Sequence, residues 1–387
     1  MRKKIIILGS TGSIGKATLS IIKKNKKDFK VVCLTAKNNY KLLAKQANEF
    51  NVKNIIIYNK SYSNLLKKNL KNKSIRILNK FENLNKFIKK KVDYTMCSIG
   101  GLSGLRPTLN AIKISKKVAI ANKESIICGW SLILKELKKY KTNFLPIDSE
   151  HYAIWNLTKN CTNEEIDEII ITASGGPFLK KPLNKINNAL PHEAIKHPKW
   201  KMGKKISIDS ATLMNKVFEI IEAYKIFNYD LKKFKILIHP QSYVHSIIKF
   251  KNGLVKILLH DTDMRIPISN SIYDEKNLKI KSNNIDYRFL NKLNFIKVSK
   301  KRFPAIRFIK NIPNKDSLYE SVIVSANDEL VNLFLKKKIR FNEIIYYLNK
   351  IINNKKFKKY RNIKPSSIRD ITDVCNLVRL KTQSISV

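Results

Sequence analysis

Residues 3–15 read KKIIILGSTGSIG, and this stretch decides the fold. The stretch 3–8, which is apolar from Ile5 to Leu8, has the length of a buried strand, and the apolar pattern after Gly15 predicts a helix through Ile22. Between them stand three glycines spaced Gly-x-x-Gly-x-x-Gly. Strand, glycine-rich turn and helix make the phosphate-binding start of a Rossmann unit, because glycine lets the backbone approach a pyrophosphate at the helix N-terminus. The alternative is a glycine-rich turn with a purely structural role.

The second predicted strand, 29–35, bears on the choice of nucleotide. An NAD enzyme would place Asp or Glu at the end of this strand to bind the ribose hydroxyls. This chain has Ala36, Lys37 and Asn38 there. A cation and an amide favour a 2′-phosphate, so the sequence predicts NADPH.

Further strands are predicted over 54–58, 74–78, 94–98 and 117–121, with helical segments between them. This alternation is typical of a parallel, doubly wound α/β sheet.

A polar cluster, Asn122-Lys123-Glu124, follows the last of these strands. Ligands bind at the carboxyl ends of parallel strands, so these side chains are candidates for a binding site. Asn122 followed by Ser125 also suits a helix N-cap, and both interpretations can hold.

Residues 145–151 read LPIDSEH and carry two carboxylates on alternate positions. In an extended or turning segment, Asp148 and Glu150 would point the same way. Two carboxylates held together repel unless a cation or a shared proton lies between them. Mg²⁺ and Mn²⁺ prefer oxygen ligands, so the pair is a candidate metal site. Taken alone, such a pair is more often solvated surface.

A second stretch, 207–219, raises the metal hypothesis. Its pattern predicts a helix over 211–224 with Asp209 or Ser210 as the N-cap. Asn215 and Glu219 are four residues apart and share a helix face, with Lys216 one position round. Such a face could bind a phosphate at one end and a metal at the other. The alternative is a solvated face with a Lys216–Glu219 ion pair.

Composition bounds the remaining possibilities. The 387 residues suffice for two or three domains, and 43% hydrophobic content supports real cores. Five cysteines without a Cys-x-x-Cys motif suit a reducing, cytoplasmic location. The net charge of +48 comes from lysines spread over the whole chain, so no specific nucleic acid is predicted as a partner. No apolar run has membrane-spanning length, and no membrane association is predicted.

The segment 191–205 is predicted to be a lid over the substrate. It combines His197, Trp200 and Gly203 with charges, and it lacks a helix or strand period. Trp seldom faces solvent permanently, and a closing loop can exclude water from a reaction site. The alternative is that Trp200 is packed permanently into the core.

Several segments in fixed order carry a family resemblance. They are the glycine loop, 121–125 (ANKES), 145–151 (LPIDSEH), 173–178 (ASGGPF), 197–203 (HPKWKMG), 209–216 (DSATLMNK) and 238–242 (IHPQS). The chain closely resembles, nearly end to end, the family of 1-deoxy-D-xylulose 5-phosphate reductoisomerases. Departures are small: Ala36 replaces the usual Gly, Thr262 a usual Pro, and 325–329 (SANDE) varies a usual Asn-Ala-Ala-Asn-Glu. Only Ala36 touches a cofactor site, where it contributes backbone.

The resemblance implies roles for particular residues. The implied metal ligands are Asp148, Glu150 and Glu219, which with Lys123 form the catalytic set. The implied cofactor site comprises Thr11, Gly12, Ser13, Ile14, Ala36, Lys37, Asn38, Asn122, Glu124 and Gly203. The implied substrate site comprises Lys123, Ser149, Glu150, Ser174, His197, Ser210, Asn215, Lys216 and Glu219.

The resemblance also implies the activity. It is the NADPH- and Mg²⁺- or Mn²⁺-dependent rearrangement and reduction of 1-deoxy-D-xylulose 5-phosphate to 2-C-methyl-D-erythritol 4-phosphate, in the non-mevalonate route to isoprenoids, by a homodimer. The expected domains are a Rossmann-like domain (1–147), a central α+β catalytic domain (148–272), a linker (273–300) and a C-terminal helical domain (301–387). The rivals are a plain NADP dehydrogenase, which would turn over without metal, and a basic nucleic-acid-binding protein.

Overall fold

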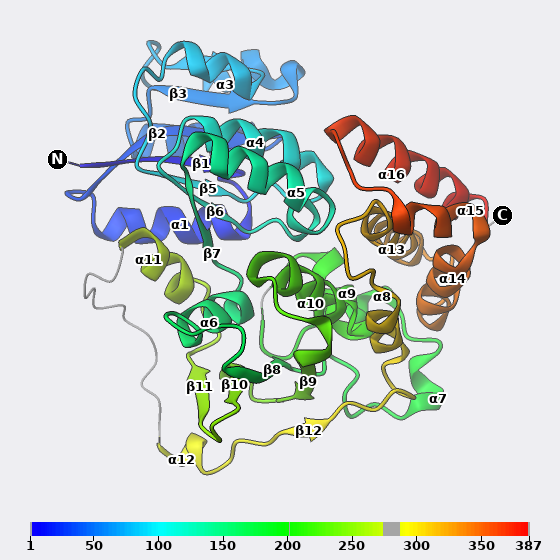
Figure 1. The fold of residues 1–387 in the computed structure, drawn as a ribbon. Coiled ribbons are helices and arrows are strands. Elements are labelled where there is room, and N and C mark those ends of the chain that lie inside the picture. Colours follow the sequence, from blue (N-terminus) through cyan, green and yellow to red (C-terminus); the bar gives the residue numbers. More distant parts are fainter. Residues whose placement is uncertain (1, 201, 274–286, 386–387) are drawn as a thin grey trace. The chain divides into compact units, whose positions relative to one another are not determined.

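The computed structural model describes residues 2–200, 202–273 and 287–385, which fall into two compact units (Figure 1). The first unit comprises residues 2–126, 131–148 and 264–273. The second comprises 127–130 and the described residues of 149–263 and 287–385. None of the helices in these described ranges is long and apolar enough to cross a membrane.

The first unit is built on a seven-stranded sheet with the strand order β4-β3-β2-β1-β5-β6-β7, in which every neighbouring pair is parallel. The strands are β1 (Lys3–Leu8), β2 (Phe29–Ala36), β3 (Asn54–Ile57), β4 (Arg76–Leu78), β5 (Tyr94–Cys97), β6 (Lys117–Ile120) and β7 (Asn143–Pro146). Consecutive strands are joined by helical segments, as a parallel sheet requires. The predicted doubly wound α/β fold is therefore confirmed.

Several helices of this unit pack against the sheet. They are α1 (Ser13–Lys24), α2 (Tyr40–Glu49), α3 (Ser63–Lys68), α4 (Leu105–Lys113), α5 (Lys123–Tyr140), α11 (Arg265–Tyr273) and the short 3₁₀ turns η1 (Lys60–Tyr62), η2 (Phe81–Lys86) and η3 (Leu102–Gly104). In α1, Leu19 and Ile22 recur at helical spacing and join Ile5 and Ile7 of β1 in the core. Helix formation here follows from burial of an apolar face rather than from propensity alone.

The placement of α11 differs from the predicted catalytic domain, which extended to residue 272. Helix α11 packs on α1, and its Ile268, Ile272 and Tyr273 enter the core of the first unit. The Ser271 hydroxyl also lies 2.8 Å from the Tyr94 hydroxyl of β5. This contact joins residues more than a hundred positions apart, so no local sequence pattern predicts it.

Chain order reverses at the centre of this sheet, between β1 and β5. Gly9 follows β1 with φ +79°, and a Cβ on it would lie 2.6 Å from the Ser98 carbonyl oxygen beyond β5. Only glycine permits both this backbone conformation and this approach. Ligands of doubly wound sheets bind at such a reversal, outside the carboxyl ends of the strands.

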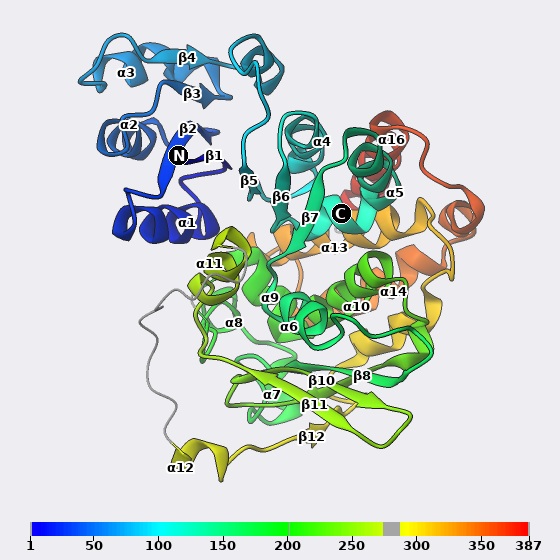
Figure 2. The same ribbon diagram turned by 60° about the vertical axis from the view of Figure 1, so that its left-hand side comes forward.

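The second unit contains a five-stranded mixed sheet with the order β11-β10-β8-β9-β12. Its strands are β8 (Ile166–Ala173), β9 (Phe234–Ile238), β10 (Val244–Phe250), β11 (Val255–Leu259) and β12 (Ile296–Lys297). Helices α6 (Ser149–Leu157) and α10 (Met214–Phe227) pack on it, as Figure 2 shows. The chain turns between β9 and β10 at Ser242, which has a left-handed φ of +61°.

The other helical elements of this unit are α7 (Leu183–Ile186), α8 (Pro191–Ala194), α9 (Lys204–Thr212), α12 (Tyr287–Leu290), α13 (Tyr319–Leu335), α14 (Phe341–Asn353), α15 (Lys355–Lys358), α16 (Ile368–Gln383), η4 (Leu231–Lys233), η5 (Pro304–Asn311) and η6 (Lys359–Asn362). Helix α13 packs against α9, α14 and α16. The C-terminal helices thus belong to one compact unit with the central sheet, whereas the sequence predicted a domain of their own. Part of the expected linker, 274–286, lies outside the described residues; β12, near the end of the linker, is an edge strand.

The helix predicted over 211–224 with a cap at Asp209 or Ser210 is wrong. Asp209 and Ser210 lie inside α9, and the chain breaks at Leu213, which has a left-handed φ of +65° before α10 begins. The Thr212 hydroxyl accepts a hydrogen bond from the Met214 N–H at this break. Leu213 is buried in a cluster with Ala173, and that packing stabilises a conformation that a Leu rarely adopts.

Candidate active site

The glycine loop between β1 and α1 exposes backbone N–H groups at the edge of the first sheet. Gly12 is the N-cap of α1, and its own N–H donates to the Gly9 carbonyl at 3.0 Å. Because it has no side chain, the N–H groups of the first turn, beginning at Ser13, have no side-chain cap and can bind a ligand. Gly12 and Ser13 are exposed, and Thr11 and Ile14 are half-buried. Their binding to a nucleotide stays a prediction.

Two more candidates for nucleotide binding follow β2. Lys37 and Asn38 are exposed, whereas Ala36 is buried at the strand end. The Asn38 side-chain oxygen accepts a hydrogen bond from the Asn59 amide at 3.2 Å. Since β1 and β2 are parallel neighbours, this cation and amide lie at the same sheet edge as the glycine loop.

Asn122 serves as a helix cap, which confirms one of its two predicted roles. Its side-chain oxygen accepts from the Ser125 N–H at 2.6 Å, and its amide donates to the Gly101 carbonyl at 2.7 Å. The residue thereby ties the loops after β5 and β6 together. In the first turn of α5, beside Glu124, Lys123 places its ammonium 2.7 Å from the Asp148 carboxylate.

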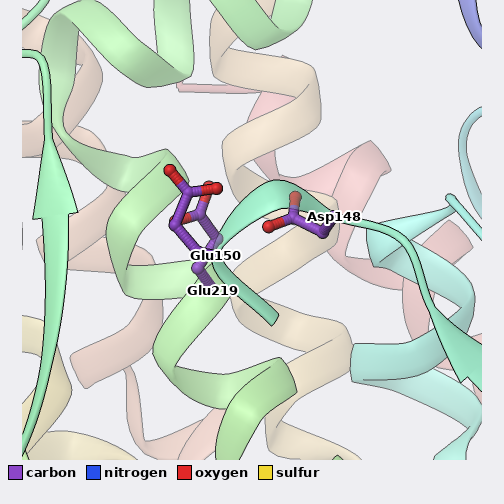
Figure 3. Close-up of side chains that lie close together, drawn as sticks. All are labelled: Asp148, Glu150 and Glu219. Carbon is purple, nitrogen blue, oxygen red and sulfur yellow. The ribbon is translucent and has the colours of Figure 1, made fainter. Parts of the chain in front are cut away.

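Three carboxylates converge at the predicted metal site. Asp148 follows β7, Glu150 lies in the first turn of α6, and Glu219 comes from α10 (Figure 3). One oxygen from each lies within 4.8 Å of the others. Asp148 and Glu150 meet at a helix start rather than along an extended segment, so the predicted pairing holds although its local geometry differs. Among the residues that the structure describes, this is the one acidic group close enough to hold a metal ion.

Lys216 joins two of these carboxylates. Its ammonium lies 2.9 Å from Glu150 Oε1 and also pairs with Glu219. Lys216 and Glu219 are only 6% and 1% exposed, so the alternative of a solvated helix face is wrong although the pair itself exists. Burial alone would raise the pKa of Glu150, but Lys216, then His245 and the Ser149 hydroxyl, outweigh it and hold this pKa well below its usual value. The site therefore stays anionic at neutral pH.

Ser174 and His197 form a second set of donors. The backbone N–H groups of Lys199 and Trp200 donate to His197 Nδ1 at 3.1 and 2.8 Å, so the ring proton lies on Nε2. Nε2 then donates to the Ser174 hydroxyl oxygen at 2.8 Å, which also accepts from the Gly176 N–H. Because two donors already satisfy that oxygen, the Ser174 O–H is left to donate outward.

Burial, and then the charge of Lys216, lower the pKa of His197 to about 4. The ring is therefore neutral at pH 7 and keeps the tautomer that its neighbours set. A neutral Nε2–H supports Ser174 without placing another cation beside Lys216.

Ser210 is brought to the same loop by a close backbone approach. Gly176 has φ +65°, and a Cβ on it would lie 2.8 Å from the Ser210 carbonyl oxygen. Asn215, at the start of α10, donates its side-chain amide to Glu219. Hydroxyl, amide and ammonium donors of this kind are the usual partners of a phosphate.

One contributor was not singled out from the sequence. His245 is buried against His260, with ring centroids 3.8 Å apart. Its Nδ1 also lies 3.9 Å from the Glu150 carboxylate, and its ring meets Trp200 edge-on at 6.2 Å. No spacing links residues 150, 200 and 245, so only the fold shows their association.

The predicted lid segment, 191–205, is partly helical. It begins with α8 and ends in the first turn of α9, and Trp200 is half-buried. Gly203 is the exposed N-cap of α9 with φ −67°, a conformation open to any residue. Its glycine is therefore not required by the backbone of this structure.

These features define a class of protein: a nucleotide-dependent, metal-assisted enzyme with an anionic substrate. The first sheet has the edge at which nucleotides bind, the three carboxylates suit a divalent cation, and the hydroxyl, amide and ammonium donors suit a phosphate.

Comparison with known proteins gives the particular family. Models described as 1-deoxy-D-xylulose 5-phosphate reductoisomerase, its C-terminal domain and the DXP reductoisomerase C-terminal domain match residues 5–129, 144–227 and 259–381. A protein of that name from Pelagibacter ubique (strain HTCC1062) is 54% identical over all of both chains.

Two solved structures have the same fold. The reductoisomerase from Zymomonas mobilis in complex with NADPH has a TM-score of 0.90 at 34% identity, covering 100% of this chain and 99% of that one. A reductoisomerase in complex with NADPH, fosmidomycin and magnesium has a TM-score of 0.91 at 29% identity, covering 99% and 98%. The chain belongs to the 1-deoxy-D-xylulose 5-phosphate reductoisomerase family and is thus an oxidoreductase, as the sequence predicts.

Proposed function

We propose that this chain converts 1-deoxy-D-xylulose 5-phosphate to 2-C-methyl-D-erythritol 4-phosphate, with oxidation of one NADPH. The observation that carries the proposal is the convergence of Asp148, Glu150 and Glu219 in a member of this family. A plain dehydrogenase needs no such group, because hydride transfer alone requires only the cofactor and a proton donor. The convergence therefore favours a reaction with a skeletal rearrangement.

The three carboxylates fit a hard divalent cation. They supply oxygen ligands only, and their oxygens are close enough to share one ion. When bound, Mg²⁺ or Mn²⁺ would act as a Lewis acid toward the oxygens of the substrate. Lys123 and Lys216 offset part of the negative charge, and Ser149 fixes one Glu150 oxygen at 2.6 Å.

The chain's own residues hold the sugar phosphate. The proposed phosphate contacts are Ser174, Ser210, Asn215 and Lys216, with His197 reaching the sugar. Binding energy from the phosphate, which does not react, orients the carbon atoms that do. Lys123, through its contact with Asp148, is the candidate for proton transfer or for electrostatic stabilisation at the carboxylate group.

The cofactor site is proposed at the carboxyl edge of the first sheet. NADPH supplies the hydride, and the loop of Thr11, Gly12, Ser13 and Ile14, with the uncapped N–H groups at the start of α1, would contact the pyrophosphate. Lys37 and Asn38, with the Ala36 backbone, are proposed to bind the 2′-phosphate. The other proposed cofactor contacts are Asn122, Glu124 and Gly203.

The expected division of labour is part of this proposal. The Rossmann-like segment would bind NADPH, and the segment from 148 onward would bind substrate and metal. The segment 191–205 would close over the substrate and exclude water, with Trp200 as its apolar cover. Its edge-on contact with His245 supports this role, because it places the indole near a residue that touches Glu150.

A homodimer in the cytoplasm is also proposed. Strand β11 is an edge of the second sheet and exposes Val255 and Ile257, beside Leu254, to solvent. An exposed apolar edge strand is suited to cover by another chain. Four of the five thiols are buried without a disulfide, which suits a reducing compartment.

The test is identification of the product. The purified chain is incubated with 1-deoxy-D-xylulose 5-phosphate, NADPH and Mg²⁺ or Mn²⁺, and the product is identified by mass and NMR. We expect 2-C-methyl-D-erythritol 4-phosphate in a one-to-one ratio with NADP⁺, and loss of turnover with a chelator. Full turnover without metal, or a product with an unrearranged carbon skeleton, would revive the plain dehydrogenase.

A further inference from the structure

Asp209 is a buried carboxylate that the proposed reaction does not use. It is 1% exposed and lies on α9, next to Ser210 in sequence. Its Oδ1 accepts a hydrogen bond from the Asn327 amide of α13 at 2.8 Å. Its Oδ2 pairs with the Lys205 ammonium, one turn earlier on α9, at 2.9 Å.

Lys205 adds a second contact with α13 and one with α10. Its ammonium lies 2.9 Å from the Asp328 carboxylate of α13 and 5.1 Å from the centre of the Phe218 ring of α10. An ammonium over an aromatic face is attracted by the ring. The network of Asp209, Asn327, Lys205 and Asp328 therefore joins α9 to α13 and touches α10.

Asp209 and Ser210 face different ways. Successive residues on an α-helix are rotated by about 100°, so Ser210 does not follow Asp209 toward α13. Ser210 instead meets the turn at Gly176, where its carbonyl leaves no room for a Cβ. Rotating or sliding α9 would therefore move Ser210 relative to the Gly176 turn.

A buried carboxylate is well suited to fix such a position. Losing a partner leaves a charge in a poorly solvated place, so the helix cannot shift without a large cost in free energy. Asn327 is fully buried and cannot be replaced there by water from the surface. One hydrogen bond of this kind determines the rotation of α9 more firmly than apolar packing, which is not directional.

We propose that Asn327 and Lys205 are positioning residues that act through Asp209. They hold α9 against α13, so that Ser210 stays beside the Gly176 turn and Ser174 in the phosphate site. This inference rests on the proposed function, because it takes that site to bind the substrate phosphate. It adds that the C-terminal helices determine the geometry of the phosphate contacts and not only the stability of the unit.

The test compares two buried polar residues of α13, one that contacts α9 and one that contacts α16. Asn327→Leu removes the hydrogen bond to Asp209, whereas Ser325→Ala removes a 2.8 Å bond to the Cys375 carbonyl of α16. We expect Asn327→Leu to raise the KM for the sugar phosphate about tenfold, from misplacement of the phosphate contacts, with the KM for NADPH nearly unchanged. Ser325→Ala should lower the thermal midpoint comparably and leave both KM values unchanged.

Binding of inorganic phosphate gives a readout that needs no turnover. Its affinity is followed by ³¹P NMR, and the component lost in Ser174→Ala defines the site. Asn327→Leu should weaken that component while Ser325→Ala leaves it intact, even if the chain failed to rearrange deoxyxylulose phosphate. Lys205→Met, at a partly exposed side chain, is the second variant should Asn327→Leu fail to fold, and it should shift the same two quantities less.

Equal phosphate affinity and equal KM in the wild type, Asn327→Leu and Lys205→Met would overturn the inference. So would a Ser325→Ala variant that loses phosphate affinity as Asn327→Leu does, because the effect would then reflect general loosening of α13. Failure of the wild type to form the rearranged product would instead count against the proposed function alone.

Discussion

Helix α10 carries a buried ionic cluster at each end. Near its start, Lys216 lies between Glu150 and Glu219. Near its end, Lys225 lies between Asp316 and Glu320. Both lysine side chains are under a tenth exposed, and each pairs with two carboxylates. By burial and charge alone the two clusters look alike.

The clusters differ in what surrounds the lysine. At the start of α10 a third carboxylate, Asp148, joins the group, and the oxygens converge within 4.8 Å. At the end, burial would lower the pKa of Lys225, but Glu320 and Asp316 outweigh it and raise this pKa, while burial raises that of Glu320. Buried ion pairs therefore mark structure as readily as function. A surplus of converging carboxylates is what distinguishes the candidate site.

The largest expected effect separates the two clusters by matched substitutions. Glu219→Gln and Glu320→Gln each replace a buried, lysine-paired carboxylate by an amide of the same shape. Because Glu219 is a proposed metal ligand, Glu219→Gln should lower turnover by at least about a hundredfold. Steady-state assays at limiting Mg²⁺ should find Glu320→Gln close to wild type, and equal losses in both variants would contradict the distinction.

The second cluster should matter for stability and not for turnover. Lys225→Met leaves Asp316 and Glu320 facing each other without a cation, which should cost about 3 kcal/mol of unfolding free energy. Turnover per folded molecule should stay near the wild-type value. Urea unfolding measures the first quantity and assays at low temperature the second. A stable Lys225→Met protein with impaired turnover would give the second cluster a functional role.

The next prediction concerns Lys37, an exposed cation, in contrast to the two buried lysines. Lys37 is proposed to bind the 2′-phosphate, so Lys37→Ala should reduce the preference for NADPH over NADH by about tenfold, the loss of one charge-assisted hydrogen bond. The change should appear in the KM for NADPH. Lys41, in α2, provides a control cation, and its replacement by Ala should leave the preference unaltered. Equal use of both nucleotides by the wild type would contradict the NADPH assignment.

The smallest effect concerns pH. His197 binds its proton near pH 4 when folded and near pH 6.5 when unfolded, so the unfolded chain binds more protons between these values. This contribution to stability is therefore full above about pH 6.5 and is lost as pH falls toward 4. With the ring partly exposed, the loss should be about 1–2 kcal/mol. Urea unfolding is measured at several pH values between 4 and 7. The unfolding free energy of His197→Gln should fall less steeply with decreasing pH than that of the wild type. Equal pH dependence in the two proteins would contradict the lowered pKa of His197.

The sequence predicted the first unit well because its signals are local. A strand, three glycines and a helix lie within some twenty residues, and the structure places β1 at the predicted bounds. Asn122 could be read as a cap for the same reason, since its partner Ser125 is three residues away. Local rules suffice where the interacting groups are neighbours in the chain.

The rest required the fold. Leu213 breaks the helix predicted over 211–224. A Leu does not by itself indicate a left-handed backbone conformation; the packing of Leu213 with Ala173, which only the fold provides, explains it. The bonds of Asp209 to Asn327 and of Lys216 to Glu150 join residues at least 66 positions apart. Spacing suggested Asp148 with Glu150 and a possible metal on the helix face of Glu219, but only the family resemblance assigned all three to one ion before the structure brought them together.

Metal binding tests the central claim most directly. Wild type, Glu219→Gln and Glu320→Gln are titrated with Mn²⁺, and free Mn²⁺ is followed by electron paramagnetic resonance. If Asp148, Glu150 and Glu219 form the metal site, the wild type and Glu320→Gln should each bind one ion per chain with equal affinity. Glu219→Gln should bind it at least about tenfold more weakly. Equal Mn²⁺ affinity in all three proteins, or no specific binding by the wild type, would contradict the account.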